Sequence, residues 1–282
     1  MPGLSHGAGQ SPFPSAFTRI KPMFRTCRFL ASALSRCIAS AAVAVFCLAG
    51  SSAAETALSA DSPTIILINP NSNAAATESM TALAQQAAGN RVRILGRTNH
   101  NAPPLLTTPE DMVQAATGVV EIGRQAAAEE GVAALIVSAF SDPGLAELRD
   151  ALPDTVVVGI GEQAFHEAAR NGRSFAIVTI TPDPALIESF RSKAEELGYG
   201  KQFKGVRVTP GDPKKLVEKP DQLDAALAEA VEQAVREDGA EAVIMGGGPL
   251  SAPATRIQSR FDVPLVVAVA AAANAALMEL SE

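Results

Sequence analysis

The chain has 282 residues, of which 47% are hydrophobic and 19% charged, and it contains no tryptophan. This composition is typical of a globular protein and excludes a disordered or fibrous one. Asp and Glu outnumber Lys and Arg by 30 to 23, which gives a formal net charge of −7. Because nucleic acids and anionic membranes attract basic surfaces, this balance excludes both as electrostatic partners.

Residues 1–54 have the organisation of a leader with a secretory signal peptide. Three arginines, at 25, 28 and 36, precede the apolar run 37–50, and the small residues 52–54 suit a signal peptidase. The run is shorter than the roughly 20 residues of a membrane-spanning helix. The sequence therefore predicts cleavage and export rather than a retained span, with Met23 as an alternative start. In a bacterium with two membranes, the expected location is the periplasm.

Cleavage after Ala54 would change both the charge and the chemistry of the chain. It would remove five of the 23 basic residues and none of the 30 acidic ones, giving a net charge of −12. All three cysteines, Cys27, Cys37 and Cys47, lie in the leader. The mature chain is therefore predicted to have no disulfide, no thiolate metal site and no cysteine nucleophile.

From Thr64 onward, short apolar runs alternate with helical patterns, which predicts parallel sheets flanked by helices. The predicted strands are Thr64–Asn69, Arg91–Gly96, Ala134–Phe140, Thr155–Ile160, Ser174–Thr181, Val206–Thr209, Ala242–Gly246 and Pro264–Val269. The clearest predicted helices are Ala74–Ala88, Glu110–Glu130, Pro184–Leu197 and Gln222–Glu237. Asp221 is the expected N-cap of the last of these helices.

The chain repeats a pattern at an offset of 108 positions. LIVSAF at 135–140 corresponds to VIMGGG at 243–248, and the same offset pairs His166 with Asn274. This predicts an α/β fold of two pseudo-symmetric halves, 64–172 and 173–282, each a small parallel sheet flanked by helices. The final helix has the alternative of packing back on the first half. Since parallel sheets bind ligands at the carboxyl ends of their strands, we expect the site in the crevice between the halves.

Four segments at the predicted strand ends resemble the aspartate/glutamate/hydantoin racemase family, and most of all its hydantoin/allantoin branch. They read INPNS at 68–72, AFSDPGL at 139–145, GIGEQAFHEAA at 159–169 and MGGGPLS at 245–251. The corresponding family segments read INPN with Ser or Thr, CFGDPGL, GIAEAAFHAA and LGCAGMA. The resemblance implies a cofactor-independent mechanism with two bases. One cysteine removes a proton next to a carboxylate or carbonyl, and the other reprotonates the opposite face.

Both cysteine positions of the family are substituted here, by Ala139 and Gly247. A family aspartate expected near the last strand is also replaced, because that stretch reads VAV at 267–269. The usual two-thiol mechanism is therefore excluded. Ser141, where the family has glycine, adds a hydroxyl beside the first lost thiol, and a hydroxyl nucleophile needs a base.

The candidate base is His166, with Glu162 one helical turn before it on the same face. These two residues and Ser141 are the candidate catalytic residues. However, Glu162 and His166 also match residues of relatives that keep their cysteines. The alternative for His166 is therefore a packed or hydrogen-bonded structural role, while Glu162 is the better candidate to face a ligand.

The candidate substrate-binding residues follow the predicted strands: Asn69, Asn71, Ser72, Ser138, Asp142, Thr179, Thr181, Gly247 and Gly248. Backbone N–H groups at the helix beginning near Ala74 suit an anion. An equal alternative is that Asn71 or Ser72 only caps that helix. Asp142 before Pro143 likewise fits a simple N-cap, and the threonines suit strands.

Metal and cofactor sites are not expected. Two isolated histidines, His100 and His166, fall short of a zinc ligand set. The glycine run 246–248 fits neither a dinucleotide nor a P-loop motif. The stretch 99–108 is either a lid over the crevice or an ordinary loop.

Two functions follow from these observations. The first is an exported enzyme of the racemase/isomerase superfamily, acting without thiols on a small carboxylate, amino acid or hydantoin-like compound. The second is a non-catalytic protein that binds such a compound on the same scaffold. A homo-oligomer is neither required nor excluded.

Overall fold

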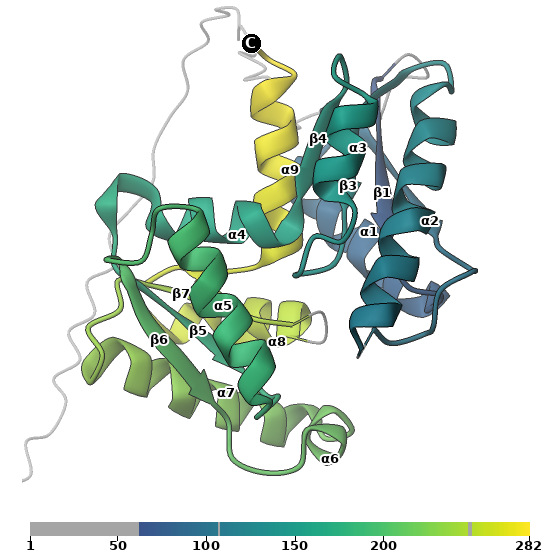
Figure 1. Cartoon of the computed structure of the whole chain (residues 1–282). Coiled ribbons are helices and arrows are strands. Elements are labelled where there is room, and N and C mark those ends of the chain that lie inside the picture. Colours follow the sequence, from purple (N-terminus) through teal and green to yellow (C-terminus); the bar gives the residue numbers. More distant parts are fainter. Residues whose placement is uncertain (1–61, 107, 248–249) are drawn as a thin grey trace, which may run out of the picture. The chain divides into compact units, whose positions relative to one another are not determined.

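The computed structural model describes residues 62–106, 108–247 and 250–282 (Figure 1). The predicted leader and Gly248 lie outside these residues. Within them, no helix is long and apolar enough to cross a membrane.

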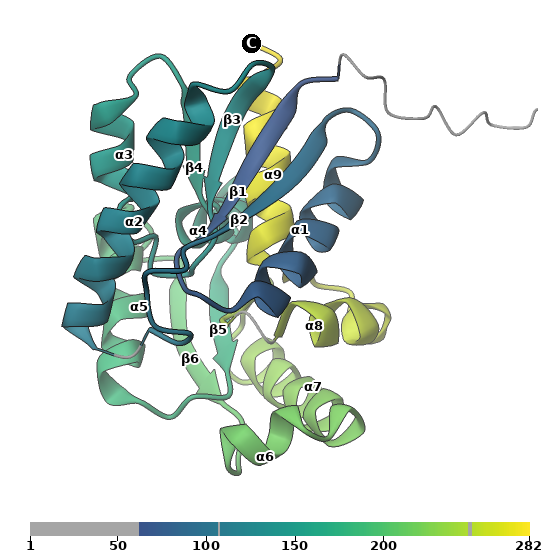
Figure 2. The ribbon, with the colours of Figure 1, turned by 90° about the vertical axis from the view of Figure 1, so that its right-hand side faces the viewer.

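The first half contains a parallel sheet with the strand order β2-β1-β3-β4. Its strands are β1 (Thr64–Asn69), β2 (Arg93–Thr98), β3 (Val132–Val137) and β4 (Val156–Gly159). Helices α2 (Pro109–Ala127) and α3 (Leu145–Ala151) pack on one face, and α1 (Ala74–Ala88) packs on the other (Figure 2). Because helices cover both faces, β1 is buried along its whole length, as its unbroken apolar run requires.

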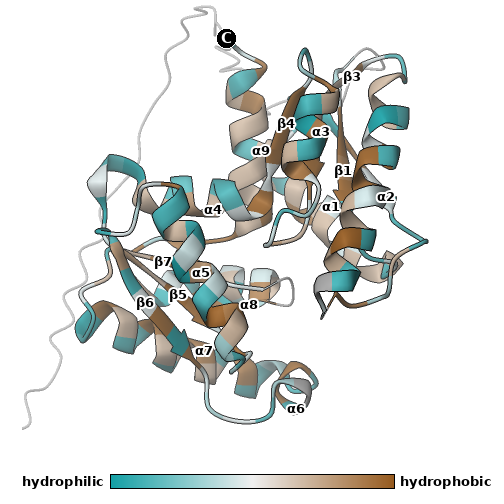
Figure 3. Ribbon diagram, in the orientation of Figure 1, coloured by the Kyte–Doolittle hydropathy of each residue, from teal (hydrophilic) through white to brown (hydrophobic). Residues whose placement is uncertain are grey.

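The second half repeats this arrangement with the strand order β6-β5-β7-β8. Its strands are β5 (Phe175–Thr179), β6 (Phe203–Val208), β7 (Ala242–Met245) and β8 (Leu265–Val266). Its helices are α5 (Pro184–Glu196), α6 (Pro213–Val217), α7 (Pro220–Arg236) and α8 (Ser251–Ile257). The predicted α/β fold of two small parallel sheets flanked by helices is therefore confirmed. In Figure 3 the central strands β1, β3, β5 and β7 are hydrophobic, whereas α2 and α7 alternate hydrophobic and hydrophilic residues.

Two further helices connect the halves through a shared core. Helix α4 (Ile160–Ala169) contacts β4 of the first sheet and β7 and β8 of the second. Helix α9 (Ala268–Glu279), at the end of the chain, packs against α1, α4 and β4 (Figure 1). One hydrophobic cluster accordingly contains buried residues of both sheets, such as Ile65 and Phe175. The composition of α9 follows from this position, because an alanine-rich helix can approach its neighbours closely.

Several predicted boundaries differ from the structure. The chain leaves the first sheet after Val137, so residues 138–140 belong to a loop and not to the predicted strand. The strand β8 is only two residues long, because the backbone enters α9 at Ala268. The prediction of Asp221 as an N-cap is wrong. Lys219 holds that position, and Asp221 lies in the first turn of α7, where a negative charge favours the helix dipole.

Candidate functional site

The strand ends of the two sheets carry the same backbone hydrogen bonds, with N···O distances between 2.8 and 3.0 Å. They join Ser138 N to Ile68 O and Asp142 N to Ala139 O in the first half, and Gly246 N to Val178 O and Leu250 N to Gly247 O in the second. Ala139 and Gly247 therefore occupy corresponding positions. Gly247 has a φ of 145°, a conformation that side chains other than glycine rarely adopt.

The loop after β1 is organised by Asn69, which is completely buried. Its Nδ2 lies 3.0 Å from each of three acceptors, Asn71 Oδ1, Asn73 O and Thr77 Oγ1. Its Oδ1 accepts a hydrogen bond from Asn71 N at 3.3 Å. The amide of Asn69 is thus used within the protein to shape the loop.

The N-cap of α1 is Asn73, whose side chain accepts a hydrogen bond from Ala76 N at 3.1 Å. The alternative that Asn71 or Ser72 caps this helix is therefore wrong. Asn71 supports the cap indirectly, because its Oδ1 accepts the N–H of Asn73 at 2.9 Å. Ser72 N donates to Pro103 O at 3.2 Å, while no partner of the Ser72 hydroxyl occurs in the described ranges.

The stretch 99–108 is tied to the same loop. Asn99 is only 2% exposed and donates from Nδ2 to Pro70 O at 3.1 Å. Together with the bond between Ser72 and Pro103, this contact anchors the beginning of the stretch. These anchors favour an ordinary packed loop over a lid.

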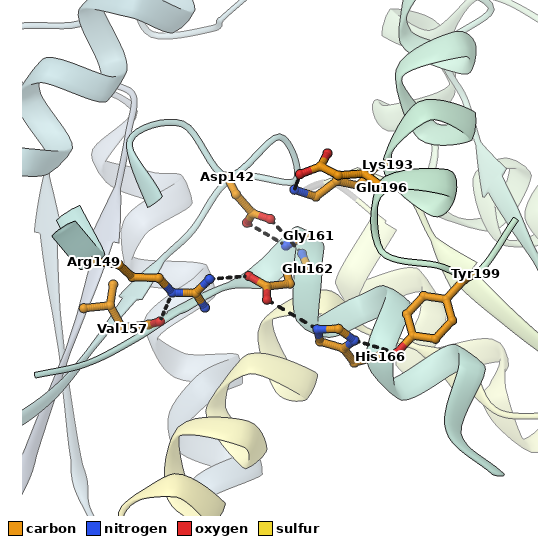
Figure 4. A network of polar contacts seen from close by, with 9 residues as sticks. All are labelled: Asp142, Arg149, Val157, Gly161, Glu162, His166, Lys193, Glu196 and Tyr199. Carbon is orange, nitrogen blue, oxygen red and sulfur yellow. Dashed lines mark hydrogen bonds and ion pairs between the residues drawn. The ribbon is translucent and has the colours of Figure 1, made fainter. Parts of the chain in front are cut away.

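Asp142 connects the loop after β3 with the beginning of α4 (Figure 4). Its carboxylate accepts hydrogen bonds from Gly161 N at 2.8 Å and Glu162 N at 2.7 Å. The expectation that Asp142 caps the helix following Pro143 is wrong, because Gly144 holds the N-cap position of α3. Asp142 instead satisfies the free N–H groups at the start of α4, nearly twenty residues away.

Burial raises the pKa of Asp142 to about 6, against the opposing effects of the two N–H groups and of Lys193 on α5. Because the folded protein then binds a proton more tightly than the unfolded chain, stability should fall as the pH rises from about 4 to about 6. The expected loss is up to about 3 kcal/mol. The D142N variant cannot titrate at this position and should lack that component. Urea unfolding of both proteins between pH 4 and 7 measures the difference, and parallel curves would contradict the assignment.

The serines of this loop contact methionine sulfur atoms. Ser138 is 3% exposed, and its Oγ lies 2.9 Å from Met80 Sδ. Ser141 is exposed, with Oγ 3.5 Å from Met112 Sδ. In the described part of the chain, no hydrogen bond joins Ser141 to His166 or Glu162. The structure therefore shows no base acting on the Ser141 hydroxyl.

Glu162 and His166 form a polar network that reaches from α3 to the second half (Figure 4). Glu162 Oε2 lies 2.9 Å from Arg149 Nη1, and Oε1 lies 3.3 Å from His166 Nε2. His166 Nδ1 in turn lies 2.7 Å from the hydroxyl of Tyr199. The hydrogen bond with His166, assisted by Arg149, lowers the pKa of Glu162 despite its partial burial. Both ring nitrogens of His166 are engaged, which favours its structural role.

The strand ends of the second half present hydroxyl groups. Thr179 is 1% exposed, and its Oγ1 accepts a hydrogen bond from Thr181 N at 3.3 Å. This bond is equivalent to the one between Asn71 N and Asn69 Oδ1 in the first half. Thr209, which sequence reasoning passed over as the last residue of a predicted strand, is buried beside Thr179. No composition or spacing signal distinguishes it from other strand threonines.

Metal ligation has no support in the three described ranges, where no group of three His, Cys, Asp or Glu side chains could hold an ion.

Comparison with known proteins assigns this architecture to a family. The family model described as Asp/Glu/Hydantoin racemase matches residues 65–276. A hydantoin racemase from Rhizobium meliloti is 30% identical over 217 residues, covering 75% of this chain and 86% of that protein. One from Paenarthrobacter aurescens is 27% identical over 212 residues, covering 75% and 89%.

Among solved structures, allantoin racemase from Klebsiella pneumoniae superposes with a TM-score of 0.70 at 28% identity, covering 78% of this chain and 88% of that one. With the family model matching well over half of the sequence, the chain belongs to the Asp/Glu/hydantoin racemase family.

Proposed function

We propose that the chain binds a small carboxylate, amino acid or hydantoin-like compound at the carboxyl ends of its strands, in the crevice between the halves, and that it transfers no proton through paired thiols. One observation carries this proposal. The two halves keep matching backbone hydrogen bonds at the ends of their strands. The corresponding positions Ala139 and Gly247, however, hold no group that can move a proton. Relatives of the hydantoin and allantoin branch support the class of ligand.

Catalysis without thiols is the second candidate, and Asp142 favours it. Its carboxyl group has a pKa raised to about 6, in the range suited to a general base near neutral pH. It also lies in the same loop as Ala139, to whose carbonyl its N–H is bonded. Against this candidate, both oxygens of Asp142 already accept backbone N–H groups.

Deuterium exchange separates the two candidates. Purified protein is incubated in heavy water with amino acids, hydantoins and malonates, and loss of the α-proton is followed by NMR alongside thermal-shift binding. Stabilisation by a compound that undergoes neither exchange nor turnover supports a binding protein. Exchange above the uncatalysed rate supports the enzyme. Absence of both effects across the panel contradicts the proposed class of ligand.

We also propose that the protein is exported to the periplasm, on the basis of the leader sequence. The expected result is a mature protein that begins at Glu55 and is released with the periplasmic fraction. N-terminal sequencing of protein from fractionated cells checks this. A chain that retains residues 24–54 in the cytoplasm would contradict it.

A further inference from the structure

Thr209 has the only buried side-chain oxygen or nitrogen without a hydrogen-bond partner in the described ranges. The residue is 3% exposed, so its hydroxyl does not form a hydrogen bond with bulk water. Buried polar groups in folded proteins nearly always have partners, and an exception calls for a physical explanation. Valine has the same shape and would avoid the cost of a buried hydroxyl. Folding alone therefore does not favour threonine at this position.

Its place in the fold identifies Thr209 as the counterpart of Asn99. Thr209 N donates to Thr179 O at 2.9 Å, as Asn99 N donates to Asn69 O at 3.0 Å. Both residues thus directly follow the second strand of their half. In parallel α/β sheets, this carboxyl edge is where ligands bind.

The two counterparts differ in how their side chains are satisfied. Asn99 bonds Pro70 O through Nδ2, and its Oδ1 accepts the N–H of Asn101 at 3.2 Å. The shorter side chain of Thr209 makes neither kind of contact. The hydroxyl of Thr181, at the same edge, is also without a partner in the described segments. Asn99 thus uses its side chain within the protein, whereas Thr209 and Thr181 each leave a hydroxyl donor unused among the described residues.

We propose that Thr209 is a ligand-binding residue, whose hydroxyl donates a hydrogen bond to a carboxylate or ring-carbonyl oxygen of the bound compound. This rests on the proposed function and adds an orientation to it, with the acceptor-rich side of the ligand toward the second half. A site with a buried donor discriminates strongly, because a compound without the matching acceptor leaves that donor unpaired. Thr209 thereby selects for compounds with an acceptor oxygen at this point.

The test compares T209V with T209S, using isothermal titration with allantoin, 5-methylhydantoin and L-aspartate. For a compound that binds the wild type, T209V should weaken binding about tenfold or more, the effect of one well-placed hydrogen bond. T209S keeps the hydroxyl and should bind within about threefold of the wild type. The free T209V protein should melt at the wild-type temperature or roughly 2 °C higher, since it loses an unsatisfied group.

Thr77→Val is the matched control for stability. Thr77 is also buried, but its hydroxyl lies 2.7 Å from Thr98 Oγ1, so the same substitution should lower the melting temperature. Wild-type binding that persists unchanged in T209V overturns the inference and leaves the proposed function standing. A wild-type protein that binds none of the three compounds overturns both. A fall in the melting temperature of T209V comparable to that of T77V shows a structural partner and also overturns the inference.

Discussion

Replacing Gly161 with alanine should lower the free energy of unfolding by roughly 3 kcal/mol or more. A Cβ atom at this position would stand 2.0 Å from Phe140 O and 2.8 Å from Asp142 Oδ2. The first of these atoms belongs to the backbone, so relief requires moving the whole loop after β3 away from α4. That movement would also weaken the hydrogen bond from Gly161 N to Asp142. The steric cost outweighs the roughly 1 kcal/mol by which alanine favours a helix over glycine.

Gly200→Ala provides the matched control. The nearest atom to its added Cβ would be Glu195 Cγ at 3.3 Å, in a flexible and exposed side chain. The expected change is within about 1 kcal/mol in either direction. Urea unfolding at pH 7 measures both variants. If G161A loses no more stability than G200A, the loop does not pack against α4 as closely as described.

The architecture could be predicted because it depends on patterns that extend along the chain. Strands covered on both faces read as continuous apolar runs, and β1 was located residue for residue from its run TIILIN. The repeat at an offset of 108 aligns Ala139 with Gly247, and the backbone hydrogen bonds show the same correspondence. Periodicity and repetition are visible without knowledge of any tertiary contact.

The local chemistry of the strand ends could not be predicted in the same way. Asn71, Ser72 and Asn73 are all good N-caps, and only the side chain of Asn69 decides among them by fixing the loop. Asp142 precedes a proline that suggests a local cap, yet its partners are the N–H groups of residues 161 and 162. The hydroxyl of Thr209 is buried without a hydrogen-bond partner only in the folded chain. The cap depends on the folded geometry of its own loop, and the partners of Asp142 depend on contacts between segments distant in the sequence.

Introducing cysteine at both Ala139 and Gly247 should raise α-proton exchange above the wild-type level, with a gain of about 10²-fold or more over the uncatalysed rate. The two positions correspond in the backbone hydrogen bonds of the halves. In the proposed crevice, the two thiols would therefore lie on opposite sides of a shared ligand. Each single variant supplies one base only, and we expect exchange without inversion from it. Exchange of 5-methylhydantoin in heavy water, followed by NMR, and loss of optical activity of a single enantiomer measure the two steps separately.

The second position limits this design, because Gly247 has a φ of 145°. Cysteine there should cost about 1–3 kcal/mol of stability, so the double variant should melt below the A139C single variant. An A139S/G247S protein is the matched control, since it carries groups of similar size whose hydroxyls ionise too weakly to exchange the proton. A double-cysteine variant that folds and binds 5-methylhydantoin but exchanges no faster than this control would show that positions 139 and 247 do not face a common carbon atom. The proposal of a shared crevice would then fail at its geometric premise, whatever the ligand.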